Sequence, residues 1–139
     1  MIFPTRQDIV RLNRRHILRS EGLLAGTDNL TNPGSLDWVL DAIQHPVFGV
    51  EPYPTIQDKA AMLAWEIIAA HVFADGNKRT GMSALKAFLR ANGYMLEALQ
   101  DEVIETALKI ADAGRSGYTR DEFIEWVRGR TRSTVPRQS

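Results

Sequence analysis

The sequence of 139 residues contains no cysteine, so it has neither a disulfide framework nor thiol chemistry. It also has no excess charge: 17 Lys and Arg balance 17 Asp and Glu, which argues against general nucleic-acid binding. No apolar run is long enough to span a membrane, since Glu66 and His71 interrupt the best one. The first residues show no signal-peptide pattern. These absences predict a cytoplasmic protein with no membrane or nucleic-acid partner.

What remains is sufficient for one globular domain. Hydrophobic residues make up 44% of the chain and charged residues 24%, and the length suits a single domain with its own core. We expect this domain to occupy residues 1–130. Residues 131–139 are polar and include Pro136, so we expect them to form a disordered tail.

Apolar residues recur at helical spacing along most of the chain and predict an all-α bundle without a substantial sheet. About six helices are expected, over residues 6–19, 36–44, 55–71, 78–91, 102–112 and 120–129. The third is apolar on most of its circumference and therefore belongs at the centre, with only Lys59 and Glu66 on a narrow polar stripe. Gly114 is expected to end the fifth helix, and Trp38 in the second is expected to pack inward.

Local signals place the helix starts. Thr5 with Asp8, Thr55 with Asp58, and Thr119 with Glu122 have the spacing of N-terminal caps, and Ser35 is expected to cap the second helix. Residues 21–33 read as a loop. Residues 47–54 hold two prolines and a glycine, which predict an irregular or hairpin-like segment. His16 and His45 are expected to be ordinary surface residues.

Residues 71–80, which we call the motif, lie between the third and fourth predicted helices. A plain helix–helix turn needs one or two breakers, such as Gly76 or Asn77. It does not need a histidine, an aspartate and two cations beside them. Each of these residues taken alone fits a helix cap, a turn or a surface charge, but their combination indicates a functional site.

The second half of the motif has the features of an anion-binding helix N-terminus. The first N–H groups of the fourth helix lack intrahelical partners, and the helix dipole places partial positive charge there. Gly76 allows close approach of a ligand to the backbone, and Lys78 and Arg79 add two full charges. The predicted nucleotide-binding residues are Gly76, Asn77, Lys78, Arg79 and Thr80.

The first half of the motif supplies a base and a carboxylate. His71 can be neutral at pH 7 and accept a proton. Asp75 can hold Mg²⁺, the ion that usually accompanies a bound polyphosphate. Together with the anion site they predict phosphoryl or nucleotidyl transfer. A transition-metal site through His71, Asp75 and Asn77 is a weaker alternative, because it lacks a second histidine or a cysteine.

The motif resembles the signature of Fic/Doc (Fido) proteins at seven positions: His71, Phe73, Asp75, Gly76, Asn77, Lys78 and Arg79. The resemblance extends from about Gly22 to about Gly93. Typical Fic enzymes have glycine where this chain has Lys78 and a second arginine where it has Met82, and both departures are similar to the Doc branch of "death on curing" toxins.

The resemblance implies a Fido-type helical bundle and a catalytic set of His71, Asp75, Lys78 and Arg79. His71 would take the proton of a target hydroxyl, and Arg79 would neutralise charge on the phosphates. Fic enzymes transfer AMP, whereas Doc phosphorylates a threonine of elongation factor Tu. Lys78 fills space that glycine leaves open, so we expect the Doc-like reaction. An AMP transferase and a catalytically silent binding module stay open as alternatives; the intact His71 argues against the second.

The resemblance also implies two protein contacts. A flap beside the site, here Tyr53, Pro54 and Thr55, would hold an extended target segment. Many Fic proteins carry an inhibitory helix with Ser or Thr four residues before Glu-Gly or Glu-Asn. Here Ile17 precedes Glu21-Gly22 at that position, so inhibition is expected from a separate small antitoxin.

Overall fold

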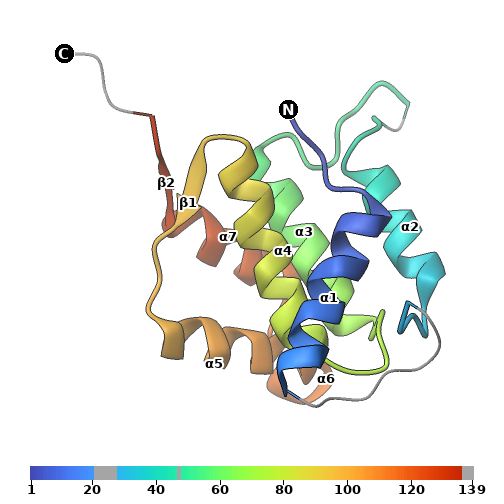
Figure 1. Cartoon of the computed structure of the whole chain (residues 1–139). Coiled ribbons are helices and arrows are strands. Elements are labelled where there is room, and N and C mark those ends of the chain that lie inside the picture. Colours follow the sequence, from blue (N-terminus) through green and yellow to red (C-terminus); the bar gives the residue numbers. More distant parts are fainter. Residues whose placement is uncertain (21–27, 47, 136–139) are drawn as a thin grey trace.

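The computed structural model describes residues 1–20, 28–46 and 48–135, so most of the loop expected over residues 21–33 lies outside it. Within the described residues the chain is mainly helical, which confirms the all-α prediction (Figure 1). The helices and strands are α1 (Arg6–Ser20), α2 (Pro33–Ala42), α3 (Ile56–Ala69), α4 (Asn77–Ala91), β1 (Tyr94–Leu96), α5 (Gln100–Ala111), α6 (Ala113–Ser116), α7 (Arg120–Gly129) and β2 (Thr131–Ser133). No described helix is long and apolar enough to cross a membrane.

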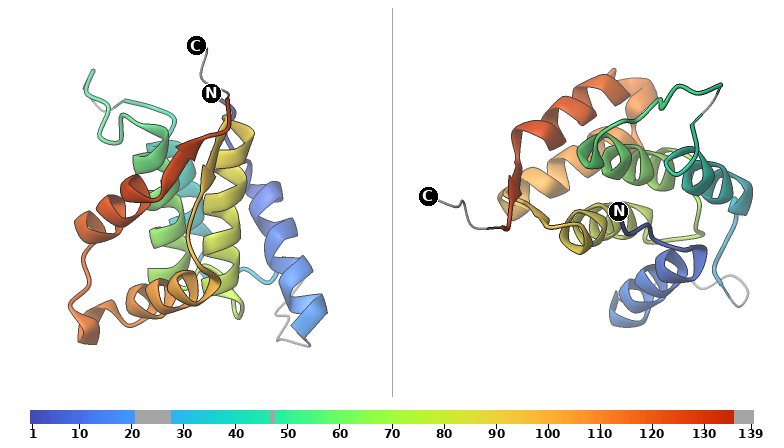
Figure 2. Two further views of the ribbon diagram at one scale, coloured as in Figure 1. Left: turned by 90° about the vertical axis from the view of Figure 1, so that its left-hand side faces the viewer. Right: turned by 90° about the horizontal axis from the view of Figure 1, so that it is seen from above.

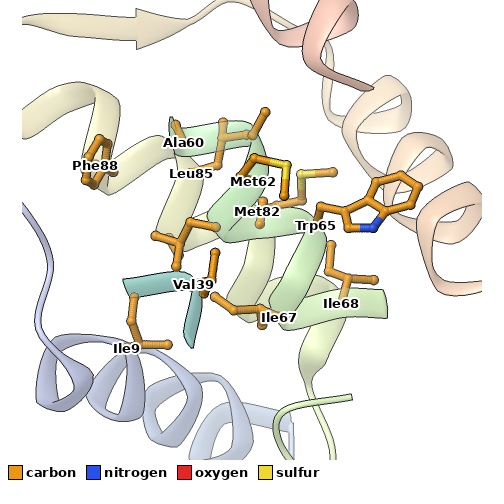
Figure 3. Close-up of a cluster of buried hydrophobic side chains, with 14 of the residues drawn as sticks. Ile9, Val39, Ala60, Met62, Trp65, Ile67, Ile68, Met82, Leu85 and Phe88 are labelled. Carbon is orange, nitrogen blue, oxygen red and sulfur yellow. The ribbon is translucent and has the colours of Figure 1, made fainter. Parts of the chain in front are cut away.

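Helix α3 is the centre of the bundle, as its sequence predicts. Eleven of its residues are buried, and it packs against α4, α7, α2 and α5. Viewed from above in Figure 2, α4 lies beside α3 and α1 lies beyond α4, while α7 and α2 cover other sides. Its side chains Met62, Trp65 and Ile67 belong to the buried cluster drawn in Figure 3.

The contact between α3 and α4 is especially close at Gly81. A Cβ atom placed there would lie 2.5 Å from Ile68 Cγ1 and 3.1 Å from the Ala64 carbonyl oxygen. Only glycine therefore lets the two helices approach to this distance. Because the motif joins these two helices, their spacing also sets the distance that the connecting loop must bridge.

Three of the predicted caps form. The Thr5 hydroxyl accepts from Asp8 N at 3.2 Å while Asp8 Oδ2 accepts from Thr5 N at 2.9 Å. The Thr55 and Thr119 hydroxyls likewise accept from Asp58 N and Glu122 N and cap α3 and α7. Ser35 as a cap is wrong, because α2 begins at Pro33 with Asn32 as its N-cap. Proline lacks an N–H and has a helical φ, so it suits the first turn of a helix.

Two expectations near the C-terminus are wrong. Gly114 does not end α5, whose C-cap is Asp112. It lies instead within α6, which ends at Ser116 and has Gly117, with a φ of 72°, as its C-cap. Residues 131–133 are not a disordered tail: β2 pairs antiparallel with β1, with Met95 opposite Arg132. Residues 136–139 lie outside the described part of the chain.

The segment before α3 is irregular, as predicted: its described residues form turns and bends, and the two-stranded sheet lies elsewhere. Phe48 and Gly49 both have positive φ, 50° and 78°. The Lys59 ammonium is 2% exposed and lies 2.5 Å from Glu51 Oε1, so Lys59 is a buried anchor for this segment rather than part of a polar stripe. Trp38 is 51% exposed, so its expected inward packing is wrong.

The close contact at Gly81 generates a stability prediction. Gly81→Ala should lower the free energy of unfolding by about 1–3 kcal/mol, because the added methyl group overpacks the α3–α4 contact. Gly34→Ala is the matched control, since nothing lies within 4 Å of a Cβ at this position in α2. Urea unfolding of both variants measures the difference. Equal stability of the two variants would show that the helices can separate at no cost.

Candidate active site

The motif spans most of the turn between α3 and α4, which we call the α3–α4 loop (residues 70–76), and continues into the first turn of α4. His71 lies just after the end of α3, and Gly76 is the N-cap of α4. The antiparallel packing of these helices brings the histidine and the start of α4 to the same end of the bundle, the lower end in Figure 1.

His71 is exposed and has a φ of 50°, a backbone conformation that costs free energy for any residue with a side chain. Its Nδ1 lies 3.3 Å from the Ala69 carbonyl oxygen. A carbonyl can only accept, so this contact favours the tautomer in which Nδ1 carries the hydrogen. The lone pair of the neutral ring is then on Nε2, where it can accept a proton.

Residues of the segment before α2 hold this strained backbone in place. The Thr31 hydroxyl donates to the His71 carbonyl oxygen at 2.9 Å. The Thr31 and Asn32 N–H groups both donate to the Val72 carbonyl oxygen, at 2.9 and 3.0 Å. The Asn32 side chain donates to the Ala70 carbonyl oxygen at 3.0 Å. These bonds satisfy carbonyl groups at the end of α3 that would otherwise lack partners.

Asn77 closes the loop through its side chain. Its Oδ1 accepts from Phe73 N and its Nδ2 donates to the Phe73 carbonyl oxygen, both at 2.8 Å. The amide is therefore already used within the loop, and Asn77 can contact an anion only through its backbone N–H. Phe73 is 1% exposed and anchors the loop in the core.

The start of α4 has the features expected of an anion-binding helix N-terminus. Gly76 has φ 76° and ψ 17°, the left-handed conformation that favours glycine. The first helical hydrogen bond runs from Thr80 N to the Gly76 carbonyl oxygen, so the N–H groups of residues 77–79 have no helical partner. Lys78 and Arg79 are exposed, and within the described residues neither forms an ion pair.

Thr80 and Met82 face the interior instead. Thr80 is 0% exposed and its hydroxyl accepts from Asn13 Nδ2 at 3.1 Å, so its predicted contact with a nucleotide is wrong for the side chain. Met82 is 5% exposed and lies in the buried cluster of Figure 3 with Met62 and Trp65. The second turn of α4 thus offers no cation at this position.

Asp75 is exposed, and its Oδ1 accepts from Gly76 N at 2.8 Å. Among the described residues no group of three His, Cys, Asp or Glu side chains could hold a metal ion. The single carboxylate of Asp75 is compatible with Mg²⁺, which commonly takes one or two protein carboxylates and completes its shell with phosphates and water. The transition-metal alternative through His71 and Asn77 has no support, because the Asn77 amide is already bonded to Phe73.

The structure does not bring the predicted flap to the motif. Tyr53, Pro54 and Thr55 precede α3, whereas His71 follows it, and a helix of 14 residues separates them by about 21 Å. Figures 1 and 2 show the two segments at opposite ends of α3. Thr55 is the cap of that helix. The segment that lies beside the motif is residues 28–32, where Leu30 and Phe73 form an antiparallel bridge.

His16 lies beside the site, contrary to the expectation of an isolated surface residue. Its Nε2 is 2.7 Å from Ser83 Oγ, one helical turn beyond Arg79. Burial lowers the pKa of His16 below its usual 6.5, and the charges of Arg79, Arg19 and Arg15 lower it further. Only the packing of α1 on α4 reveals this proximity, because the residues are far apart in sequence.

Comparison with known proteins identifies relatives of this chain. The model of the "Fic/DOC family" matches residues 3–89. The Toxin Doc of Mycolicibacterium smegmatis (strain ATCC 700084 / mc(2)155) is 36% identical over 88 residues, which cover 63% of this chain and 68% of the relative. The matched region includes α1, the α3–α4 loop and most of α4.

The depressed pKa of His16 generates a pH prediction. The unfolded chain binds a proton at His16 more readily than the folded one, so this residue destabilises the fold as pH falls below about 6.5. His16→Gln should therefore flatten the loss of unfolding free energy between about pH 7 and 5. His45→Gln, with an exposed side chain, is the control. Parallel pH profiles for wild type and His16→Gln would contradict the assignment.

Proposed function

The chain belongs to the Fic/DOC family, and we propose that it is a Doc-like toxin that transfers the γ-phosphate of ATP to a hydroxyl group of another protein. One observation carries the proposal. An exposed histidine, held in a strained conformation, lies in the same loop as a helix N-terminus whose first N–H groups lack helical partners. Two cations follow there, and neither forms an ion pair with any residue that the structure describes. A base beside an anion-binding site is what phosphoryl transfer to a hydroxyl requires.

In the proposed reaction the target hydroxyl attacks the γ-phosphorus. Nε2 of His71 accepts the hydroxyl proton while the new oxygen–phosphorus bond forms. The bond between the γ-phosphorus and the β,γ-bridging oxygen breaks, and ADP leaves with that electron pair. The N–H groups of Gly76 and residues 77–79 bind phosphate oxygens, and Arg79 neutralises the negative charge on the leaving group.

Asp75 is the residue that would hold Mg²⁺. The ion would supply positive charge that offsets the repulsion between the phosphates. The ligand-free loop has the Asp75 carboxylate on the Gly76 N–H, so phosphate binding at that N–H requires the carboxylate to move away. This exchange makes the carboxylate available to a cation at the moment when phosphate arrives.

Lys78 favours γ-phosphate transfer over AMP transfer. In the resembling Fic enzymes this position is glycine, which leaves room for phosphate against the backbone. The exposed Lys78 side chain fills that room and presents its charge at the start of α4. Met82 adds to the difference, because this buried apolar residue stands where the resembling Fic enzymes have their second arginine. We infer that ATP binds here with the γ-phosphate toward His71.

The proposed partners follow from the family and the relative. Because the relative is named Toxin Doc, we propose that this chain also has a toxic activity. We further propose that it acts in the cytoplasm and that a small antitoxin restrains it. By resemblance to Doc, the target is a threonine of elongation factor Tu. Residues 28–32 are the segment beside His71, so we place the docked target segment there rather than at Tyr53.

Labelled ATP distinguishes the two transfer reactions. The protein is incubated with elongation factor Tu and Mg²⁺, using ATP labelled at either the α- or the γ-phosphate. Label should pass to the target only from the γ-position. In Lys78→Gly, γ-transfer should fall by roughly tenfold or more, because nucleotide orientation is no longer set by the side chain.

Label passing from the α-position would show AMP transfer and would overturn the argument from Lys78. Label from neither position, with ATP bound, would identify a silent binding module. If Lys78→Gly keeps full γ-transfer, Lys78 does not decide which phosphate moves.

Two arginines of α4 provide a second test. Arg79 lies in the first turn and Arg90 in the last, and both are exposed. Arg79→Ala should reduce kcat/KM for ATP by roughly a hundredfold, because it removes a positive charge that stabilises the transition state. Arg90→Ala should leave kcat/KM unchanged. Equal effects in steady-state assays would mean that the anion site is not at the start of α4.

A further inference from the structure

A buried amide behind the α3–α4 loop has no part in the mechanism above. Asn13 lies on the inward face of α1 and is 0% exposed. Its Nδ2 donates to the Asp75 carbonyl oxygen at 2.8 Å and to Thr80 Oγ1 at 3.1 Å, and its Oδ1 accepts from Asn29 Nδ2 at 3.0 Å. The Asp75 carbonyl can only accept, so the amide nitrogen must face it and the orientation of the amide is determined.

The bond to Asp75 fixes the direction of the next N–H group. The described chain contains no cis peptide bond, so the peptide between Asp75 and Gly76 is trans. In a trans peptide the C=O and N–H groups point to opposite sides. Because Asn13 holds the carbonyl toward the interior, the Gly76 N–H must point away from α1, where it meets the Asp75 carboxylate.

The same network holds the neighbouring peptide. Asn29, which is 1% exposed and has a φ of 58°, accepts from Ala74 N at 3.0 Å through its carbonyl oxygen. Helix α1 also contacts the glycine directly: a Cβ on Gly76 would lie 3.2 Å from Asn13 Nδ2 and 3.1 Å from Ile17 Cδ1. Among the described residues, the inner side of the loop is therefore bonded and packed against α1, which leaves its outer side for a ligand.

We propose that Asn13 is a positioning residue that aims the Gly76 N–H at the phosphates of the nucleotide. The proposal deepens the proposed function and rests on phosphate binding at Gly76. Without Asn13 the Asp75–Gly76 peptide can rotate, and the anion site loses a pre-oriented donor. Pre-orientation matters because a donor that must reorganise gives less of its hydrogen-bond energy to the ligand.

The chain offers a matched control at the other end of α4. Asn92 also uses its amide for three bonds: it donates to the Ile2 and Phe88 carbonyl oxygens and accepts from Ile2 N. It caps the C-terminus of the same helix, whose 15 residues separate it from the loop by about 22 Å. Asn13→Leu and Asn92→Leu thus remove similar bonds, but only the first should affect the site.

The experiment measures three properties of both variants: the melting temperature, the residual dipolar coupling of the Gly76 N–H, and the affinity for ATP with Mg²⁺ by calorimetry. Both variants should melt below wild type. Only Asn13→Leu should change the Gly76 coupling, and it should weaken ATP binding by about tenfold or more, the loss expected when a hydrogen bond to a charged group is no longer pre-oriented. Should Asn13→Leu not fold, Asn13→Ser provides the same readouts with a smaller side chain.

Gly76 couplings and ATP affinities that match between folded Asn13 and Asn92 variants would overturn the proposal. If wild type itself binds no ATP, the proposed function fails, and the Gly76 coupling alone then tests whether Asn13 positions the Gly76 N–H group. A coupling altered only by the Asn13 substitution then supports the positioning role, and an unaltered one excludes it.

Discussion

The reversal of the chain between α3 and α4 is the constraint on which the site depends. Gly81 allows the two helices to pack closely, and the chain reverses between them within residues 70–76. Such a turn leaves backbone C=O groups at the end of one helix and N–H groups at the start of the next without intrahelical partners. Several of these groups on the inner side of the loop have protein partners, whereas the N–H groups of residues 77–79 have no helical partner.

The partners are side chains of small amides and hydroxyls. Thr31 and Asn32 donate to carbonyl oxygens at the end of α3. The Asn77 side chain bonds to the Phe73 backbone, and the Asn13 side chain donates to the Asp75 carbonyl oxygen. Together they maintain positive φ at His71 and Gly76. Strain of this kind persists only when the surroundings over-determine it, and it is commonly found at functional sites. The loop therefore holds the exposed His71 and the N–H groups at the start of α4 in place without the aid of a bound ligand.

The local features of this protein could be predicted from its sequence. Apolar spacing defined the central helix α3, and the caps at Thr5, Thr55 and Thr119 followed from residues three positions apart. Non-local features could not be predicted. Examples are the pairing of β2 with β1, the burial of Lys59 and the bond from Asn13 to Asp75. Each of these depends on how the fold packs its segments together.

The flap was misplaced for a related reason. Tyr53 and His71 are near in sequence, but α3 lies between them and carries them to opposite ends of the bundle. Residues 28–32 are farther from His71 in sequence and yet contact it. The motif residues were found because they are contiguous, so their site needed only one turn of the chain. Thr80 was the exception, since its place on the inner face of α4 turns its hydroxyl toward Asn13.

The central claim is that His71 acts as the base while the start of α4 binds phosphate without it. His71→Asn tests this directly, because asparagine tolerates a φ of 50° better than alanine does but cannot accept the proton. ATP affinity and γ-phosphate transfer should be measured on the same preparation. The account predicts an ATP affinity within about twofold of wild type, with transfer reduced by about 10²–10⁴-fold. Transfer at the wild-type rate, or ATP affinity that falls as far as transfer does, would contradict it.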